Sequence, residues 1–244
     1  MKHHLATGET RLSVRSRFVD SQRQQAPVPE RTGASDSGHR DRVFLPLGYE
    51  PGYDYPLLVW LPGADAGRFD LGRTMVRLSL RNYLAVQADL AGGAEGCFQA
   101  VEQMVDRYSV HSRRIYLIGT GDGGTAAFRI ACRQATAFAG VISVGGRFPL
   151  GEGLFGRLSD IRELPMLLCC TTGSLADSAP MQHDIDRTLR LFHAAGGLFG
   201  LRVYPELAGA RWRPAASRAV LHDVDRWIMD EVCRIPANEA TAIV

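Results

Sequence analysis

A short apolar segment that runs into a cluster of glycines constrains this chain most. Residues 115–118 read Ile-Tyr-Leu-Ile, and residues 119–124 read Gly-Thr-Gly-Asp-Gly-Gly. A short apolar run is typical of a buried strand, and glycine allows the sharp backbone turn that this cluster indicates. Small residues such as Ala127 and Ala131 follow and favour a helix. The segment therefore predicts a strand, a tight glycine turn and a helix that begins near Asp122.

The same alternation continues along the chain. Apolar runs that predict strands lie at residues 43–46, 57–61, 83–88, 114–118, 139–144, 165–170 and 201–203. Apolar residues recur at helical spacing in the segments 71–78, 98–108, 185–192 and 220–228. This pattern predicts an α/β fold: a mainly parallel, doubly wound sheet with helices on both faces and right-handed crossovers. Ligands bind beyond the carboxyl ends of the strands in such sheets, so we expect the site in the loops there.

Charge and composition exclude several classes of function. The chain has 28 Lys and Arg against 26 Asp and Glu, which gives a net charge of +2 at pH 7. This balance provides no general electrostatic attraction to nucleic acid or to anionic membranes. No apolar run approaches the length of a membrane span, and the first residues do not lead into the apolar region of a signal peptide. We therefore expect a cytoplasmic protein with neither a nucleic-acid nor a membrane partner.

Composition divides the chain into three parts. Residues 1–40 are polar and predict a flexible arm, residues 41–234 form a single expected domain, and residues 235–244 are a short tail. The five cysteines contain no C-x-x-C pair, so we expect reduced, buried thiols rather than disulfides or a zinc site. The sequence contains no phosphate-binding glycine motif and no metal-ligand cluster, and we expect neither a cofactor nor a metal.

Three segments resemble the α/β-hydrolase superfamily, in particular its small esterase, carboxylesterase/phospholipase and polyhydroxybutyrate-depolymerase-like branch. They are residues 56–64 (Pro-Leu-Leu-Val-Trp-Leu-Pro-Gly-Ala), 112–119 (Ser-Arg-Arg-Ile-Tyr-Leu-Ile-Gly) and 138–146 (Phe-Ala-Gly-Val-Ile-Ser-Val-Gly-Gly), in the family's order. The resemblance covers roughly residues 42–234 and implies the α/β-hydrolase fold with a minimal cap or none. Fold alone does not fix function, which depends on the residues of the site.

The glycine cluster resembles the nucleophile elbow of this family, G-x-S-x-G, with one departure. Gly119 and Gly123 match the two outer glycines, and Gly121 stands where the family has its serine. Serine acyl transfer also requires a histidine base and an acid that orients it. The family's histidine follows the last strand, but residues 204–214 contain no histidine, and Ala210 stands near its position. The resemblance therefore implies that both the nucleophile and the base are missing.

Two acidic or basic residues remain as candidates for the rest of a triad. Asp177 follows the strand at 165–170 and best matches the position of the acid. A carboxylate favoured by the dipole at a helix N-terminus explains Asp177 equally well. His222 lies inside the last helical segment, where we expect it to face solvent rather than to act as a displaced base.

The backbone beside the glycine turn is expected to attract anions. In active relatives, the N–H groups at the positions of Ala64 and Asp122 form the oxyanion hole, next to Gly63 and Gly121. A helix N-terminus attracts carboxylate or phosphate even without catalysis. Asp122 adds its own charge there, and we interpret it as a capping or dipole-stabilising residue. The alternative takes Asp122 as a nucleophile, as in the dehalogenase and epoxide-hydrolase branches.

Residues 145–157 contain aromatic and arginine side chains and follow the next strand. They form a small lid, a clamp for an acidic ligand or a mobile loop with ordinary anchors, and we favour the loop. Our leading hypothesis is a degenerate, esterase-like α/β-hydrolase without a Ser-His-Asp triad, which binds a small-molecule or anionic ligand or a partner without catalysis. The alternative is a hydrolase that uses Asp122 or a relocated base. A third reading is a purely structural role, through the N-terminal arm or oligomerisation.

Overall fold

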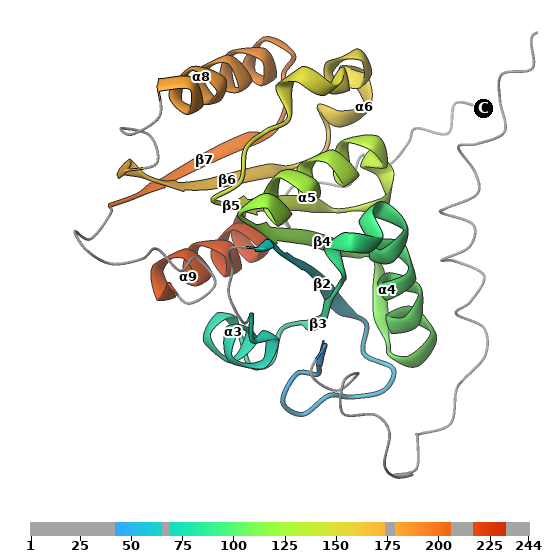
Figure 1. Cartoon of the computed structure of the whole chain (residues 1–244). Helices are drawn as coiled ribbons and strands as arrows, with labels where there is room; N and C mark the ends of the chain where they lie inside the picture. The colour runs from blue at the N-terminus through green and yellow to red at the C-terminus, as the bar shows by residue number, and fades with distance from the viewer. Residues whose placement is uncertain (1–41, 65–68, 174–178, 206–216, 233–244) are drawn as a thin grey trace, which may run out of the picture.

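The computed structural model describes residues 42–64, 69–173, 179–205 and 217–232. Its centre is a seven-stranded sheet with the strand order β1-β3-β2-β4-β5-β6-β7 (Figure 1). The strands are β1 (Val43–Phe44), β2 (Tyr55–Pro62), β3 (Leu84–Gln87), β4 (Val110–Thr120), β5 (Gly140–Val144), β6 (Met166–Thr171) and β7 (Phe199–Tyr204). All neighbouring strands are parallel except β1, which pairs antiparallel with β3. The predicted mainly parallel α/β sheet is therefore confirmed.

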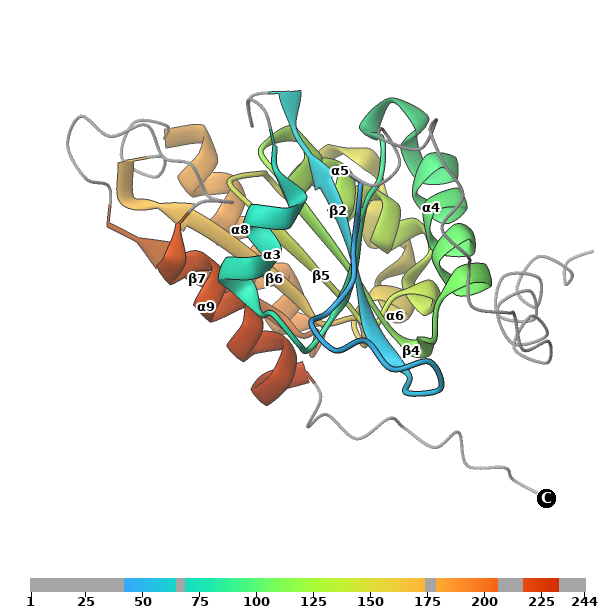
Figure 2. The same cartoon turned by 90° about the horizontal axis from the view of Figure 1, so that it is seen from below.

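Helices cover both faces of the sheet, as predicted (Figures 1 and 2). They are α3 (Leu71–Leu78), α4 (Gly93–Arg107), α5 (Asp122–Arg133), α6 (Leu158–Ile161), α8 (Ala179–Ala194) and α9 (Arg218–Arg226), and a π-helical segment continues α9 over Trp227–Val232. The apolar side chains of α4, α5, α6 and α8 pack in one core cluster, and those of α3 and α9 in a second cluster on the opposite face. Burial on both faces explains why the central strands read as continuous apolar runs.

Several strand boundaries differ from the prediction, most of all the start of β4. β4 begins at Val110, because Tyr55 of β2 pairs with Val110 across an irregularity in the register. The intervening residues His111, Ser112, Arg113 and Arg114 are polar and mostly exposed, so apolar periodicity could not reveal them as strand. The first strand is also shorter than expected and ends at Phe44, before Pro46. No helix in the part of the chain that the structure describes is long and apolar enough to cross a membrane.

The register of the central strands determines where a site can form. Leu61 of β2 pairs with Gly119 of β4, and Pro62 pairs with Thr120. The two strands therefore end at the same edge of the sheet, and the loop after β2 lies beside the turn that links β4 to α5. This is the edge at which α/β proteins bind their ligands.

Candidate functional site

The turn between β4 and α5 has the sharp geometry that the glycine cluster predicts. Gly121 follows the last residue of β4 and serves as the N-cap of α5, with φ 55° and ψ −126°. Its N–H donates to the carbonyl of Val144 on β5 at 2.9 Å, and its carbonyl accepts the N–H of Gly124 at 2.8 Å. Residues with a side chain rarely adopt such a positive φ. The backbone at Gly121 is therefore held by hydrogen bonds on both sides in a conformation that favours glycine.

The neighbouring glycines are required by close packing. A Cβ added to Gly119 would overlap the carbonyl of Gly123, and one added to Gly123 would overlap the carbonyl of Leu61. At Gly121, by contrast, an added Cβ would meet no atom within 4 Å. The turn therefore excludes side chains at its two outer glycines and leaves open space at the position between them.

The loop after β2 brings Gly63 against this turn. The N–H of Gly63 donates to Oγ1 of Thr120 at 3.3 Å. A Cβ added to Gly63 would lie 3.0 Å from the backbone nitrogen of Asp122, so the two backbone segments touch. Of the residues expected at an oxyanion hole, Gly63, Gly121 and Asp122 thus lie together, and the exposed Ala64 follows directly in the chain.

Asp122 is the first residue of α5 and its side chain is exposed. The N-cap position belongs to Gly121, which has no side chain, so the expectation that Asp122 caps the helix is wrong. The carboxylate still lies in the first turn, where the helix dipole favours a negative charge. Within the described residues, no hydrogen bond or ion pair of this carboxylate is present. The dipole interaction is therefore the stabilising role that the geometry leaves for Asp122.

The structure describes only some of the other residues considered for a triad. Asp177 and Ala210 lie outside the described residues. His222 lies on α9 with its side chain 71% exposed, and its Nδ1 is 3.6 Å from Oδ1 of Asp223; it faces solvent, as expected. His111 lies near the start of β4, nine residues before Thr120, which corresponds to about 30 Å along an extended strand.

Residues 145–157 are held along α5. The N–H of Arg147 donates to Oγ1 of Thr125 at 2.9 Å, and the buried Phe148 packs against Phe128. Nε of Arg129 donates to Oε2 of Glu152 at 2.6 Å, and this hydrogen bond lowers the pKa of the Glu152 carboxyl. These contacts support the interpretation of the segment as an anchored loop rather than a lid.

Sequence reasoning missed a buried hydroxyl beneath the turn. Ser143 on β5 is fully buried, and its Oγ has no hydrogen-bond partner among the described residues. A Cβ added to Gly124 or to Gly146 would collide with this Oγ, so the hydroxyl is enclosed between two glycine backbones. In the sequence, Ser143 is one polar residue within an apolar strand. Its enclosure becomes visible only from the residues that surround it in the structure. Its enclosure excludes Ser143 as a substitute nucleophile.

A second polar contact joins β6, β7 and α9. The hydroxyl of Tyr204 donates to Oδ2 of Asp223 at 2.9 Å and lies 3.9 Å from Sγ of Cys169. Burial, together with the nearby Cys169 and Asp223, raises the pKa of the Tyr204 hydroxyl. Burial also raises the pKa of the Cys169 thiol to about 12. Both groups are therefore protonated at neutral pH and act as structural hydrogen-bonding groups.

The described cysteines are free and buried, as expected. They are Cys97, Cys132, Cys169 and Cys170. Burial raises the pKa of the Cys97 and Cys132 thiols to about 12 and that of Cys170 to about 11. Because only the thiolate is a good nucleophile, burial makes these four thiols weak nucleophiles. Within the described ranges, no group of three or more His, Cys, Asp and Glu side chains is arranged to hold a metal ion.

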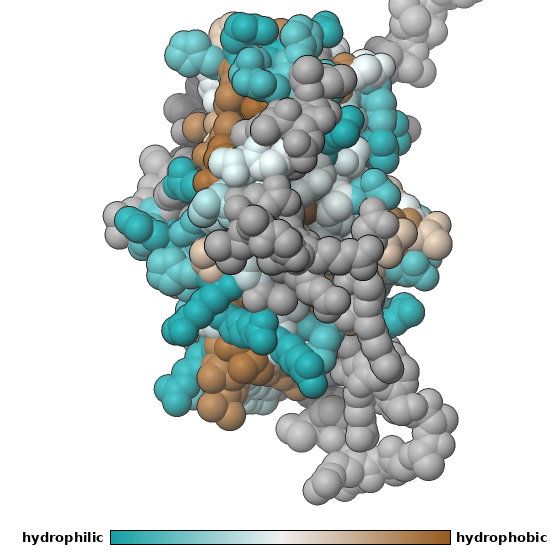
Figure 3. Space-filling view, turned by 60° about the vertical axis from the view of Figure 1, so that its left-hand side comes forward, coloured by the Kyte–Doolittle hydropathy of each residue, from teal (hydrophilic) through white to brown (hydrophobic). Residues whose placement is uncertain are grey.

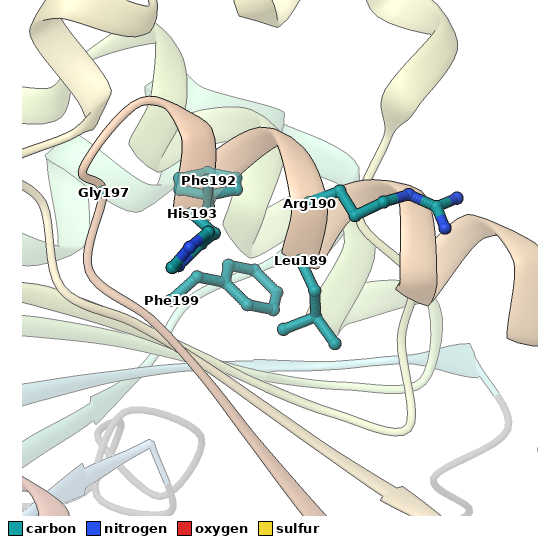
Figure 4. Close-up of a pocket in the computed structure, with 6 residues that line it drawn as sticks. All are labelled: Leu189, Arg190, Phe192, His193, Gly197 and Phe199. Atoms are coloured by element: carbon teal, nitrogen blue, oxygen red, sulfur yellow. The ribbon is translucent and has the colours of Figure 1, made fainter.

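Two surface pockets lie away from the glycine turn. One, of about 400 Å³, is lined by Leu189, Arg190, Phe192, His193, Gly197 and Phe199, between α8 and β7 (Figure 4). The other, of about 270 Å³, is lined by Glu50, Tyr53, Tyr55, Pro56, Arg81, Asn82, Arg114 and Met229. Neither includes a residue of the turn itself.

Neither a protein-family model nor a curated protein sequence matches the chain. Solved structures do match it. A thermostable esterase superposes with a TM-score of 0.57 at 17% identity, covering 77% of this chain and 57% of its own. A thermophilic esterase from Thermogutta terrifontis gives a TM-score of 0.55 at 16% identity and covers 81% of this chain and 89% of its own. An S-formylglutathione hydrolase from Staphylococcus aureus gives 0.50 at 12% identity, with coverages of 72% and 81%.

The superpositions establish a shared fold. At such low sequence identity they leave the activity open. The chain spans a little over half the length of the first of these esterases. These superpositions cover between 72% and 81% of this chain. The chain has the α/β-hydrolase fold.

Proposed function

We propose that this protein is a degenerate, esterase-like α/β-hydrolase that does not perform serine acyl transfer and instead binds a small ligand or a partner. The observation that carries the proposal is Gly121. It occupies the apex of the turn with φ 55°, and the space that a nucleophilic side chain would fill is open. Without a side chain at this position, no serine acyl-enzyme can form here. The absence of histidine from residues 204–214 supports the same conclusion.

The ligand that best suits the turn is a small anion or a group that carries one. The backbone nitrogens at the start of α5 and the backbone of Gly63 lie together at the carboxyl edge of the sheet. A helix N-terminus favours carboxylate and phosphate groups through its free N–H groups and its dipole. The Asp122 carboxylate lies in the same turn and opposes this attraction, so we expect weak binding of inorganic anions.

Ester hydrolysis tests this proposal directly. Purified wild-type protein should hydrolyse short p-nitrophenyl esters no faster than an unrelated protein. Gly121→Ser should also remain at background, because no base takes the serine proton, whereas Gly121→Ser combined with Ala210→His should form a slowly turning-over acyl-enzyme. Wild-type turnover above background would overturn the proposal. Strong turnover by Gly121→Ser alone would show that a base is present elsewhere.

Asp122 supports a second candidate function, a hydrolase with an aspartate nucleophile. The specific observation is that its carboxylate is exposed and free of ion pairs among the described residues, beside the backbone of Gly63. Such an enzyme forms an ester at the aspartate, which water then cleaves. After a single turnover in H₂¹⁸O, the Asp122 carboxylate would carry ¹⁸O, detectable by peptide mass spectrometry. Absence of the label in a preparation that hydrolyses substrate would exclude this candidate.

A further inference from the structure

The outer edge of β7 has no partner strand among the described residues, because the sheet order ends with β7. The carbonyl of Leu198 accepts the N–H of Met166 on β6. Because the backbone groups of successive strand residues point to alternate sides, those of Phe199, Leu201 and Val203 point away from β6. An unpaired edge with such groups is a template for another strand.

The same three residues also present an apolar surface. Phe199 contacts Phe192 of α8 with ring centroids 4.9 Å apart, so Phe199, Leu201 and Val203 share the α8 face of the strand. Val203 is 43% exposed, although it lies in a strand. Figure 3 brings the left-hand side of Figure 1 forward. It shows an apolar strip in its upper part, at the height of β7 and α8 in Figure 1. β7 contains no proline, and its one charged residue, Arg202, lies on the opposite face of the strand from Phe199, Leu201 and Val203.

We propose that β7 pairs with β7 of a second copy of this chain, antiparallel about a two-fold axis at Leu201. In this register Leu201 faces Leu201 of the second copy, and Phe199 faces its Val203. Each of these pairs exchanges two backbone hydrogen bonds, because all three residues point outward. The result is one continuous sheet through both copies.

Charge selects this register over its neighbour. Centring the axis on Arg202 would place two arginines directly opposite each other, which destabilises a strand pair. Centring it on Leu201 places Arg202 opposite Gly200 of the second copy. Gly200 lies on the α9 face of the strand, since an added Cβ would be 4.0 Å from Nε1 of Trp227. The arginine therefore meets a residue without a side chain, and no like charge lies opposite it.

The pocket beside Phe199 receives the second copy in this arrangement. It is lined by Leu189, Phe192, His193 and Phe199 on the α8 side of the strand (Figure 4). Val203 of the second copy lies opposite Phe199 on this same face, and its side chain fills the pocket. A valine that is exposed in the single chain and a pocket that is empty in it thus become complementary.

Helix α8 has a charge pattern that suits the two-fold axis. Asp186 and Arg190 are one turn apart and therefore share one side of the helix. Both are exposed, and Arg190 also borders the pocket. In an antiparallel arrangement, Asp186 of one copy lies near Arg190 of the other, twice by symmetry.

Sedimentation equilibrium of the full chain tests the proposal. We expect a mass of twice the 26.7 kDa of one chain. Val203→Lys should weaken the dimer by more than about tenfold, because it places two charges in the pockets. Val76→Lys is the matched control: this valine is 53% exposed on α3, far from β7 in the sheet order, and the change should leave the dimer intact. A monomeric wild-type protein at about 100 µM, above typical dissociation constants of stable dimers, would overturn the proposal.

Oxidative cross-linking tests the register independently of dimer strength. In a hydrogen-bonded antiparallel pair the Cα atoms are about 5.5 Å apart, within the range for a disulfide. Leu201→Cys should therefore form an intermolecular disulfide under mild oxidation, above the wild-type background, whereas Val203→Cys should not. Cross-linking of Val203→Cys in preference to Leu201→Cys would contradict the register. Protection of the β7 amides from hydrogen exchange in a monomer would show that another segment of the same chain covers the edge, and would contradict the dimer.

Discussion

Replacing Gly121 and Gly123 separately by alanine tests the geometry of the turn. The first substitution is opposed by the backbone conformation, and the second by steric overlap. At Gly121 the added Cβ meets nothing within 4 Å, and only the φ of 55° resists it. A non-glycine residue in such a backbone conformation costs about 1–3 kcal/mol. For a domain of this size, that corresponds to a fall in Tm of about 2–12 °C.

In Gly123→Ala the backbone conformation is favourable and the steric overlap is not. Gly123 lies inside α5 and has no positive φ, so helix propensity alone would make alanine more stable by up to about 1 kcal/mol. The added Cβ, however, overlaps the carbonyl of Leu61, and backbone must move to admit it. We expect a loss of more than about 3 kcal/mol, at the upper end of overpacking effects.

Chemical denaturation of both variants measures this difference. Gly151→Ala serves as the control, since this exposed glycine has open space around its added Cβ and no positive φ; its effect should stay within about 0.5 kcal/mol. A Gly123→Ala protein as stable as Gly121→Ala, or more stable than the wild type, would refute the close approach of α5 to the end of β2.

Two further predictions concern charged groups. Asp122→Asn should cost about 1 kcal/mol or less, the value of a helix-dipole interaction, and should enlarge the thermal shift produced by phosphate or acetate because a negative charge leaves the turn; identical shifts for both proteins would exclude an anion site. Glu152→Gln should destabilise by less than about 1 kcal/mol at pH 7, as a surface ion pair does. The pKa of Glu152 is lowered from 4.5, so this stabilisation is present above that pH and disappears as the pH falls through the folded-state pKa. A difference that grows toward low pH in urea denaturation would contradict the role of Arg129.

The fold could be predicted from local pattern because both faces of the sheet are buried. The continuous apolar runs of β2 and β4 and the glycines at 119–124 each specify their element without reference to distant residues. Residues 111–113 escaped prediction because their side chains are polar and mostly exposed, although they lie within β4. The apolar pattern therefore does not predict strand residues whose side chains are exposed.

The site could be predicted only in part. The turn and the approach of Gly63 follow from strand order, which places the ends of β2 and β4 side by side. The anchoring of the loop after β5 depends on the ion pair between Glu152 and Arg129, 23 residues apart, and no local pattern indicates it. The enclosure of Ser143 likewise depends on two glycines from other elements. Long-range contacts between polar residues are thus the part that sequence patterns do not contain.

We propose that the turn at Gly121 carries no serine nucleophile, and labelling with a fluorophosphonate probe distinguishes a chain with an activated serine from one without. The probe forms a covalent bond with an activated serine, and intact-mass spectrometry of the purified full chain counts the bonds formed. We expect the protein to keep its unmodified mass under conditions in which an active serine esterase is labelled completely. Stoichiometric labelling at a single serine would show that an activated nucleophile exists, and would contradict the account.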